Sequence, residues 1–123
     1  MLEYVQDLGE TYDAMRSWLA PGGWISHTID YTSHGTDDAW DGHWAYGDTA
    51  WRLVGSTSER LNREPHSVHL GLARRAGFRI VRDMTWSRPP ATPKHKLAPR
   101  FRNLSDEDLT TAGCFLQARA ASD

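Results

Sequence analysis

The sequence predicts an α/β protein with a small, mostly parallel sheet. This prediction depends on three observations. A helical pattern over Asp7–Trp18 ends at Pro21-Gly22-Gly23, and a β-prone run begins at Trp24. Proline cannot continue a helix, and glycine accepts the positive φ of a tight reversal. The run Trp24–Tyr31 is almost uninterruptedly apolar, which suits a strand buried on both faces of a parallel sheet. A second unit of helix, glycine and strand then follows over residues 67–86. We therefore expect Trp24–Tyr31 to be the central strand.

The first helix has a start signal and an apolar stripe. Asp7-Leu8-Gly9-Glu10 has the form of a capping box, in which the first side chain accepts from the amides of the first turn. Apolar residues then recur at spacings of four, three and four, namely Leu8, Tyr12, Met15 and Leu19. This spacing indicates one face of a helix that packs on the sheet.

The second helix is predicted over Ser67–Ala76, with Ser67 as its cap and Gly77 at its end. Phe78 begins the next strand, whose charged residues favour a position nearer a sheet edge. Ser105 and the acids that follow it indicate a short helix over residues 106–112. Cys114–Ala118 is predicted as the last strand.

Two long segments separate these elements within what we interpret as a single domain, residues 1–123. Residues 32–64 contain Trp40, Trp44 and Trp51 and no long periodic stretch. Since aromatic rings need a surface to cover, we expect an ordered, lid-like insertion with one or two short helices over the carboxyl edge of the sheet. Residues 87–99 contain four of the six prolines and are predicted to form an exposed loop.

Several stretches together resemble a known family. Leu2-Glu3-Tyr4-Val5, the turn Leu19-Ala20-Pro21-Gly22-Gly23 into a strand that ends on Ile29-Asp30, and Ala76-Gly77-Phe78 follow one another in order. Their order and spacing resemble the carboxyl-terminal half of a class I S-adenosylmethionine-dependent methyltransferase, and the resemblance covers most of the chain. It implies a partial Rossmann-like sheet, mostly parallel, with an antiparallel final strand. It also implies methyl transfer to an oxygen or nitrogen of a small-molecule acceptor.

The candidate site lies where Trp24–Tyr31 ends, because ligands of open parallel sheets bind beyond the carboxyl ends of the strands. The resemblance implies that a strand-ending acid and a following histidine, here Asp30 and His34, open the acceptor pocket. Histidine suits the single general base that the reaction needs, and Asp30 would orient it or bind the acceptor. Acceptor contacts are expected from Tyr31, Trp44, Trp51, Asn62 and Arg63, and cofactor contacts from Leu2 and Glu3.

His27 and Arg63 each have an ordinary interpretation beside the functional one. A histidine in a buried strand is more often a hydrogen-bonded core group than a substrate contact, and His27 stays open to both. The guanidinium of Arg63 suits an anionic or hydroxylated acceptor, although a surface salt bridge is the commoner use of an arginine.

The family's glycine-rich loop and its ribose-binding acid would lie upstream of Met1. We therefore expect the 123 residues alone to bind S-adenosylmethionine weakly or not at all, and to be inactive if the missing half is required. The alternative is a non-catalytic fragment or partner domain that completes or regulates a methyltransferase through an open sheet edge. A second copy of the chain or another polypeptide would pair there, because unpaired strand edges need a partner.

Composition narrows the remaining classes. The single cysteine, Cys114, offers no thiolate cluster and fits a reducing cytosol, and no apolar run is long enough to span a membrane. We expect a cytoplasmic protein. Residues 1–50 contain nine acids and one base, and residues 51–123 contain seven acids and thirteen bases. The tryptophans fall mainly in the acidic half and the arginines in the other, so we expect no nucleic-acid partner. His27 and Asp30 are expected on opposite faces of their strand, so together with His34 and His43 they predict no metal site.

Overall fold

The structure is a computed structural model that describes residues 2–54 and 61–121. Its sheet has three strands in the order β1-β3-β2. The strands are β1 (Trp24–Asp30), β2 (Phe78–Ser87) and β3 (Thr111–Ala120). Both pairings are antiparallel, so β1 and β2 run in the same direction on either side of β3. A bulge interrupts the β2–β3 register between Ile80 and Arg82.

The predicted mostly parallel, Rossmann-like sheet is wrong for the described residues, because every strand pairing there is antiparallel. The strand predicted to be central, Trp24–Tyr31, forms β1 at one edge. The last strand enters between β1 and β2 and takes the central position. Burial along β1 alternates, with Ile25 and Ile29 buried and Trp24 49% exposed. That alternation is typical of a sheet covered on one face only.

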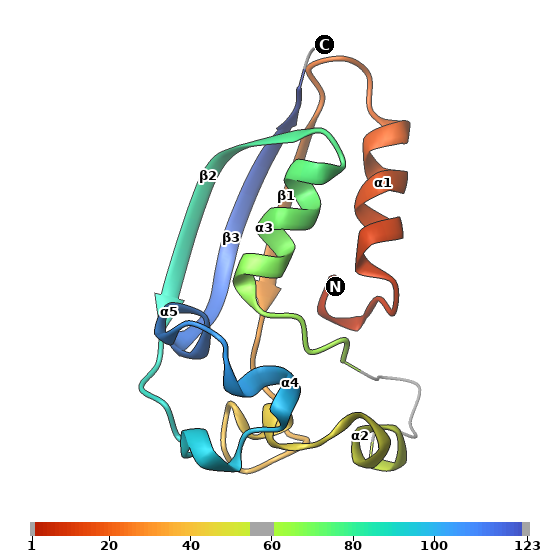
Figure 1. Ribbon diagram of the computed structural model, residues 1–123. Helices are drawn as coiled ribbons and strands as arrows, with labels where there is room; N and C mark the ends of the chain where they lie inside the picture. Colours follow the sequence, from red (N-terminus) through yellow and green to blue (C-terminus); the bar gives the residue numbers. More distant parts are fainter. Residues whose placement is uncertain (1, 55–60, 122–123) are drawn as a thin grey trace.

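Two helices, α1 (Leu8–Trp18) and α3 (His66–Arg75), lie on one face of the sheet (Figure 1). The prediction of Asp7 as the first cap is confirmed, since its carboxylate accepts from the Glu10 amide at 2.9 Å. The prediction of Ser67 as the second cap is wrong. Helix α3 begins one residue earlier, and the Ser67 amide and hydroxyl donate to Asp108 instead.

The main hydrophobic core lies between this helix pair and the sheet. It combines apolar side chains from α1 and α3 with alternate residues of each strand, and its buried members are Leu2, Leu8, Tyr12, Ile25, Ile29, Tyr31, Ala73, Phe78, Cys114, Leu116 and Ala118. The opposite face of the sheet exposes large side chains. Trp24, Met84 and Trp86 are each about half exposed there.

The remaining segments lie together beyond one end of the sheet, except η1, which lies beside the start of α1 (Figure 1). They contain the short helices η1 (Leu2–Tyr4), η2 (Gly42–Ala45), α2 (Asp48–Val54), η3 (Lys94–Lys96), α4 (Pro99–Arg102) and α5 (Asp106–Thr110). A second buried cluster joins residues 40–44 to residues 97–112 through Trp40, Trp44, Leu97, Ala98, Phe101, Leu109 and Ala112. The aromatic residues of the predicted insertion therefore pack against the segment that follows β2.

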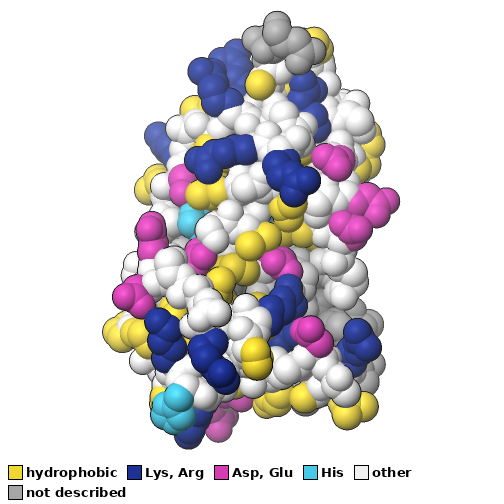
Figure 2. Space-filling model, viewed as in Figure 1, with side chains coloured by type: hydrophobic (Ala, Val, Ile, Leu, Met, Phe, Trp, Pro, Cys, Tyr) yellow, Lys and Arg dark blue, Asp and Glu magenta, His cyan; other side chains and the backbone are white. Residues whose placement is uncertain are grey.

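Charged side chains are spread over the face that carries α1 and α3. Lys and Arg side chains lie at both ends of this face, with Asp and Glu side chains between them (Figure 2). Within the described ranges, no helix combines the length and apolar character needed to cross a membrane.

Candidate functional site

The carboxyl end of β1 meets the first residues of the chain. Asp30 is the last residue of the strand, and its Oδ1 accepts from the Thr32 amide at 2.8 Å. Its Oδ2 lies 3.5 Å from Nε2 of His34. The same nitrogen lies 3.9 Å from Oε1 of Glu3, so two carboxylates from different elements face one imidazole.

A tight turn holds His34 in this position. His34 has a φ of 52° and Gly35 a φ of 80°, both in the left-handed region that glycine tolerates and other residues adopt at a cost. The Thr36 amide and hydroxyl both donate to the Ser33 carbonyl, at 3.0 and 2.7 Å. The turn therefore directs the histidine back toward the end of β1.

The imidazole of His34 is oriented through both nitrogens. Nδ1 lies 3.0 Å from the Tyr4 hydroxyl, and the two rings meet edge to face with centroids 5.3 Å apart. If the Tyr4 hydroxyl donates to Nδ1, the proton of the neutral ring is on Nε2 and points toward Asp30. The side chain is 23% exposed. The lone pair of the ring is then on Nδ1, beside the Tyr4 hydroxyl. A proton from a bound group can reach the ring through that hydroxyl, and the two carboxylates share the resulting positive charge.

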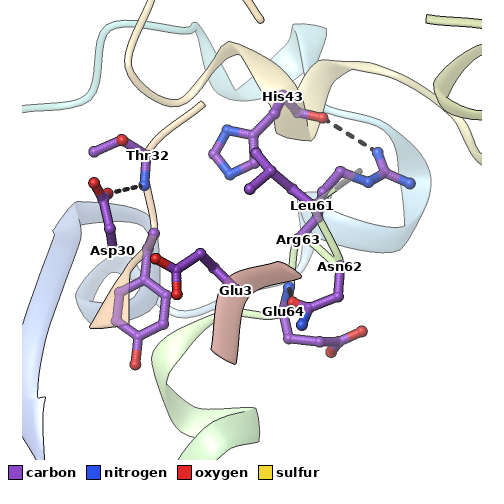
Figure 3. Close-up of a pocket in the computed structure, with 9 residues that line it drawn as sticks. Glu3, Asp30, Thr32, His43, Leu61, Asn62, Arg63 and Glu64 are labelled. Carbon is purple, nitrogen blue, oxygen red and sulfur yellow. Dashed lines mark hydrogen bonds between the residues drawn. The ribbon is translucent and has the colours of Figure 1, made fainter. Parts of the chain in front are cut away.

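A small cavity lies beside this cluster, between the end of β1 and residues 61–64 (Figure 3). Its lining residues are Glu3, Asp30, Tyr31, Thr32, His43, Leu61, Asn62, Arg63 and Glu64. The cavity volume is about 10 Å³, the space of roughly one water molecule. An organic acceptor molecule therefore does not fit inside it.

Burial determines the chemistry of His43, which lines the cavity. The side chain is 2% exposed, and its Nδ1 has no hydrogen-bond partner among the described residues. Burial lowers the pKa of His43 to about 3, and the positive charge of Arg63 adds to the effect. His43 is therefore neutral at physiological pH.

The guanidinium of Arg63 forms its hydrogen bonds inside the protein. It donates to the carbonyls of His43 and Tyr46 at 3.2 and 2.6 Å, and to Asp48 at 3.0 Å. Burial, followed by the charge of Arg100, lowers the pKa of Arg63 to about 10. The side chain is 2% exposed, and its two terminal nitrogens bond to the fold, whereas Nε has no partner among the described residues.

The aromatic residues predicted to form the pocket wall are buried. The indole nitrogens of Trp44 and Trp51 donate to the carbonyls of Arg63 and Leu61, at 3.0 and 3.2 Å. The Tyr31 ring is 4% exposed and extends into the main core. The two tryptophans therefore hold the segment 61–63 in place through its backbone carbonyls.

Asn62, predicted to contact the acceptor, bonds to the segment that contains the residues predicted to contact the cofactor. Its side-chain amide donates to the carbonyls of Leu2 and Val5, each at 2.8 Å, and its backbone amide donates to the Glu3 carbonyl. Leu2 is buried in the main core, whereas Glu3 lines the cavity. Of the two predicted cofactor residues, only Glu3 is therefore placed beside Asp30 and His34.

His27 does not belong to this cluster. It pairs with Leu116 on the core face of β1, and burial lowers its pKa. Asp30 lies on the opposite face, as the alternation of a strand requires.

Two residues of the cluster were not predicted as site residues. Tyr4 contacts His34 across 30 positions, and His43 lines the cavity from η2. No local pattern indicates either contact, although the position of Tyr4 directly after Glu3 could have suggested it.

Searches against protein-family models, curated proteins and solved structures find no match to this chain. The site is therefore interpreted from its own geometry.

Proposed function

We propose that this chain takes part in methyl transfer from S-adenosylmethionine to an oxygen or nitrogen of a small acceptor, with His34 as the general base. The observation that supports the proposal is the orientation of His34. One ring nitrogen lies 3.0 Å from the Tyr4 hydroxyl, and the other lies 3.5 Å from the Asp30 carboxylate, in a partly exposed side chain.

The reaction makes few demands on the protein. The methyl donor is already a reactive electrophile, so alignment of donor and acceptor supplies most of the acceleration. One proton has to leave the acceptor oxygen or nitrogen. It would pass to the Tyr4 oxygen while the Tyr4 hydroxyl proton moves to Nδ1 of His34. Asp30 and Glu3 would then stabilise the imidazolium.

The test uses S-adenosylmethionine labelled in its methyl group, at millimolar concentration because we expect weak donor binding. The acceptors are a panel of phenols, alcohols and primary amines. His34→Ala should lower kcat by a factor of about 10² to 10⁴ if His34 is the base. If the residue only positions the acceptor, KM should rise while kcat survives.

His95→Ala is the matched control, because His95 is an exposed histidine of η3 far from the cluster in sequence. It should leave the kinetics unchanged. Absence of labelled product from the wild-type protein with every acceptor would reject methyl transfer by this chain. A lower melting temperature of His34→Ala with unchanged kinetics would leave His34 a structural role only.

A second candidate function is that of a partner domain, and the outer edge of β1 favours it. The amides of Ala120 and Tyr31 bond across to Gly23 and Ala112, so odd-numbered residues of β1 bond to β3. The backbone groups of the even-numbered residues, such as Thr28, then point away from the sheet. In an antiparallel pairing of β1 with β1 of a second copy, the two His27 residues would lie opposite each other. Trp24 of each copy would then lie opposite Asp30 of the other, and the outward backbone amides and carbonyls of the two strands would face one another.

The other edge of the sheet is better protected, because β2 carries a bulge and the charged residues Arg79, Arg82 and Asp83. Light scattering should therefore find a dimer that Thr28→Pro dissociates and Thr28→Val retains. The outward amide of Thr28 makes proline compatible with the β1–β3 pairing. A monomeric wild-type protein at high concentration would overturn self-pairing through this edge.

A further inference from the structure

Three side chains of types that can ligate a metal, from three different elements, lie close together beneath α3. His66 is the first residue of α3, Asp83 lies in β2 and Cys114 lies in β3. One nitrogen, one carboxylate oxygen and the sulfur of these residues all lie within 4.8 Å of one another. His66 and Cys114 are buried, and the Asp83 side chain is 26% exposed.

The sheet register explains why an acid lies here. Asp83 pairs with Leu116, a fully buried residue, and so occupies the face of β2 that points toward the helices. A carboxylate at such a position is costly unless it is paired. Its Oδ2 lies 2.9 Å from Nε2 of His66, which makes the pair the closest polar contact between β2 and α3 among the described residues.

Tyr31 connects the other two members of the cluster. Its hydroxyl lies 2.8 Å from Nδ1 of His66 and 3.4 Å from Sγ of Cys114. In metal sites the second nitrogen of a ligating histidine is normally held by such a partner, which fixes the tautomer and the ring orientation.

We propose that His66, Asp83 and Cys114 bind a divalent transition metal, with Zn²⁺ as the ion that the donor set suits best. Imidazole nitrogen, thiolate sulfur and carboxylate oxygen are all zinc ligands, whereas Mg²⁺ and Ca²⁺ prefer oxygen alone. One thiolate and one carboxylate neutralise the dication. Three protein ligands leave a fourth position for water or another ligand, and the partly exposed Asp83 marks the route of entry.

Metal binding requires the protons of His66 and Cys114 to rearrange, and the Tyr31 hydroxyl links these two residues. The contacts allow one proton arrangement for the metal-free protein in which the Cys114 thiol donates to the Tyr31 oxygen, Tyr31 donates to Nδ1 of His66, and Nε2–H donates to Asp83. When the metal binds Nε2, the imidazole proton moves to Nδ1 and is donated to Tyr31, whose hydroxyl proton then points at the thiolate. The thiol proton passes to solvent, so binding releases one proton.

Cobalt(II) is the probe, added to the tag-free, reduced protein. We expect a near-ultraviolet absorption band from thiolate-to-cobalt charge transfer, which Zn²⁺ abolishes in competition. Titration calorimetry in buffers of different ionisation enthalpy should find about one proton released per Zn²⁺. Zn²⁺ should also raise the melting temperature.

Variants separate the site from adventitious binding. Cys114→Ser should remove the band, and Asp83→Asn and His66→Gln should each weaken Zn²⁺ binding at least tenfold. Tyr31→Phe keeps all three ligands but should weaken binding about 10- to 100-fold. Asp106→Asn, an exposed acid elsewhere, should change nothing.

Two results would overturn the proposal. The first is a wild-type protein that gives no band with millimolar Co²⁺ and no change in melting temperature with Zn²⁺. The second is a band that persists in both Asp83→Asn and His66→Gln, which would show binding to the thiol alone.

Discussion

The guanidinium carbon of Arg63 lies 4.7 Å from the centroid of the Trp51 ring. The same guanidinium lies 4.9 Å from the ring centroid of Phe101, in the second hydrophobic cluster. Arg63 thus joins the aromatic residues of the predicted insertion to α4, while its φ of 62° places it in the left-handed region. A buried cation in this position holds several segments together, so its loss affects all of them.

Arg63→Met should therefore destabilise the protein by roughly 2–4 kcal/mol, because the carbonyls of His43 and Tyr46 lose their donor inside the protein. Arg63→Lys should recover only part of the loss, since an ammonium group cannot reproduce the planar fork. Urea denaturation measures both. Arg75→Lys, at an exposed position of α3, is the control. Equal stability of Arg63→Met and wild type would contradict the role assigned to this side chain.

Stability should fall as the pH is lowered from 6.5 toward 3. Burial lowers the pKa of both His43 and His69 to about 3 from the ordinary 6.5. In this window the unfolded chain binds protons that the folded chain does not, so the free energy of unfolding decreases with falling pH. Each histidine contributes a slope of about 1.4 kcal/mol per pH unit.

Urea denaturation at a series of pH values checks this expectation. His69→Phe should reduce the slope by about the share of one histidine, even though it also removes the 3.1 Å contact with the Tyr12 hydroxyl. Identical slopes for wild type and His69→Phe would show that His69 binds protons equally in the folded and unfolded states, which contradicts a lowered pKa.

The thiol of Cys114 should be unreactive in the folded, metal-free protein. The residue is fully buried, and burial raises its pKa to about 11. At pH 8 only about one thiol in a thousand is then ionised, and the thiolate is the reactive form. In urea roughly a tenth or more of the thiol is ionised at this pH, so a disulfide reagent should react with the native protein at least about a hundredfold more slowly. Rapid, stoichiometric reaction of the native protein would contradict this burial.

Gly113→Ala should displace the indole of Trp86. A Cβ atom at Gly113 would lie 2.3 Å from Cζ2 of Trp86, which covers the glycine on the open face of the sheet. Trp86 is 46% exposed, so its ring can swing outward at a cost of about 1 kcal/mol. Urea denaturation and the indole NMR resonance of Trp86 measure the effect. Gly47→Ala, where a Cβ meets nothing within 4 Å, should change neither.

Elements with local signals could be predicted from the sequence. Asp7 caps α1, Gly77 with its φ of 100° separates α3 from β2, and Ser105 caps α5. Each signal acts over a few residues, through backbone geometry or a hydrogen bond to a nearby amide. The prediction of polar residues at the end of Trp24–Tyr31 also placed Asp30 and His34 together, because they are four residues apart around a turn.

Strand order and the partners of the site residues could not be predicted in this way. The apolar run Trp24–Tyr31 indicated a strand but not how many of its faces are covered, and it forms an edge because β3, more than 80 residues away, takes the centre. Contacts of this kind depend on the free energy of packing and pairing over the whole chain, and no pattern within one segment records them. The sequence by itself determined where helices, turns and the polar end of β1 lie. Only the tertiary structure decided that Tyr4 meets His34, and that His66, Asp83 and Cys114 meet beneath α3.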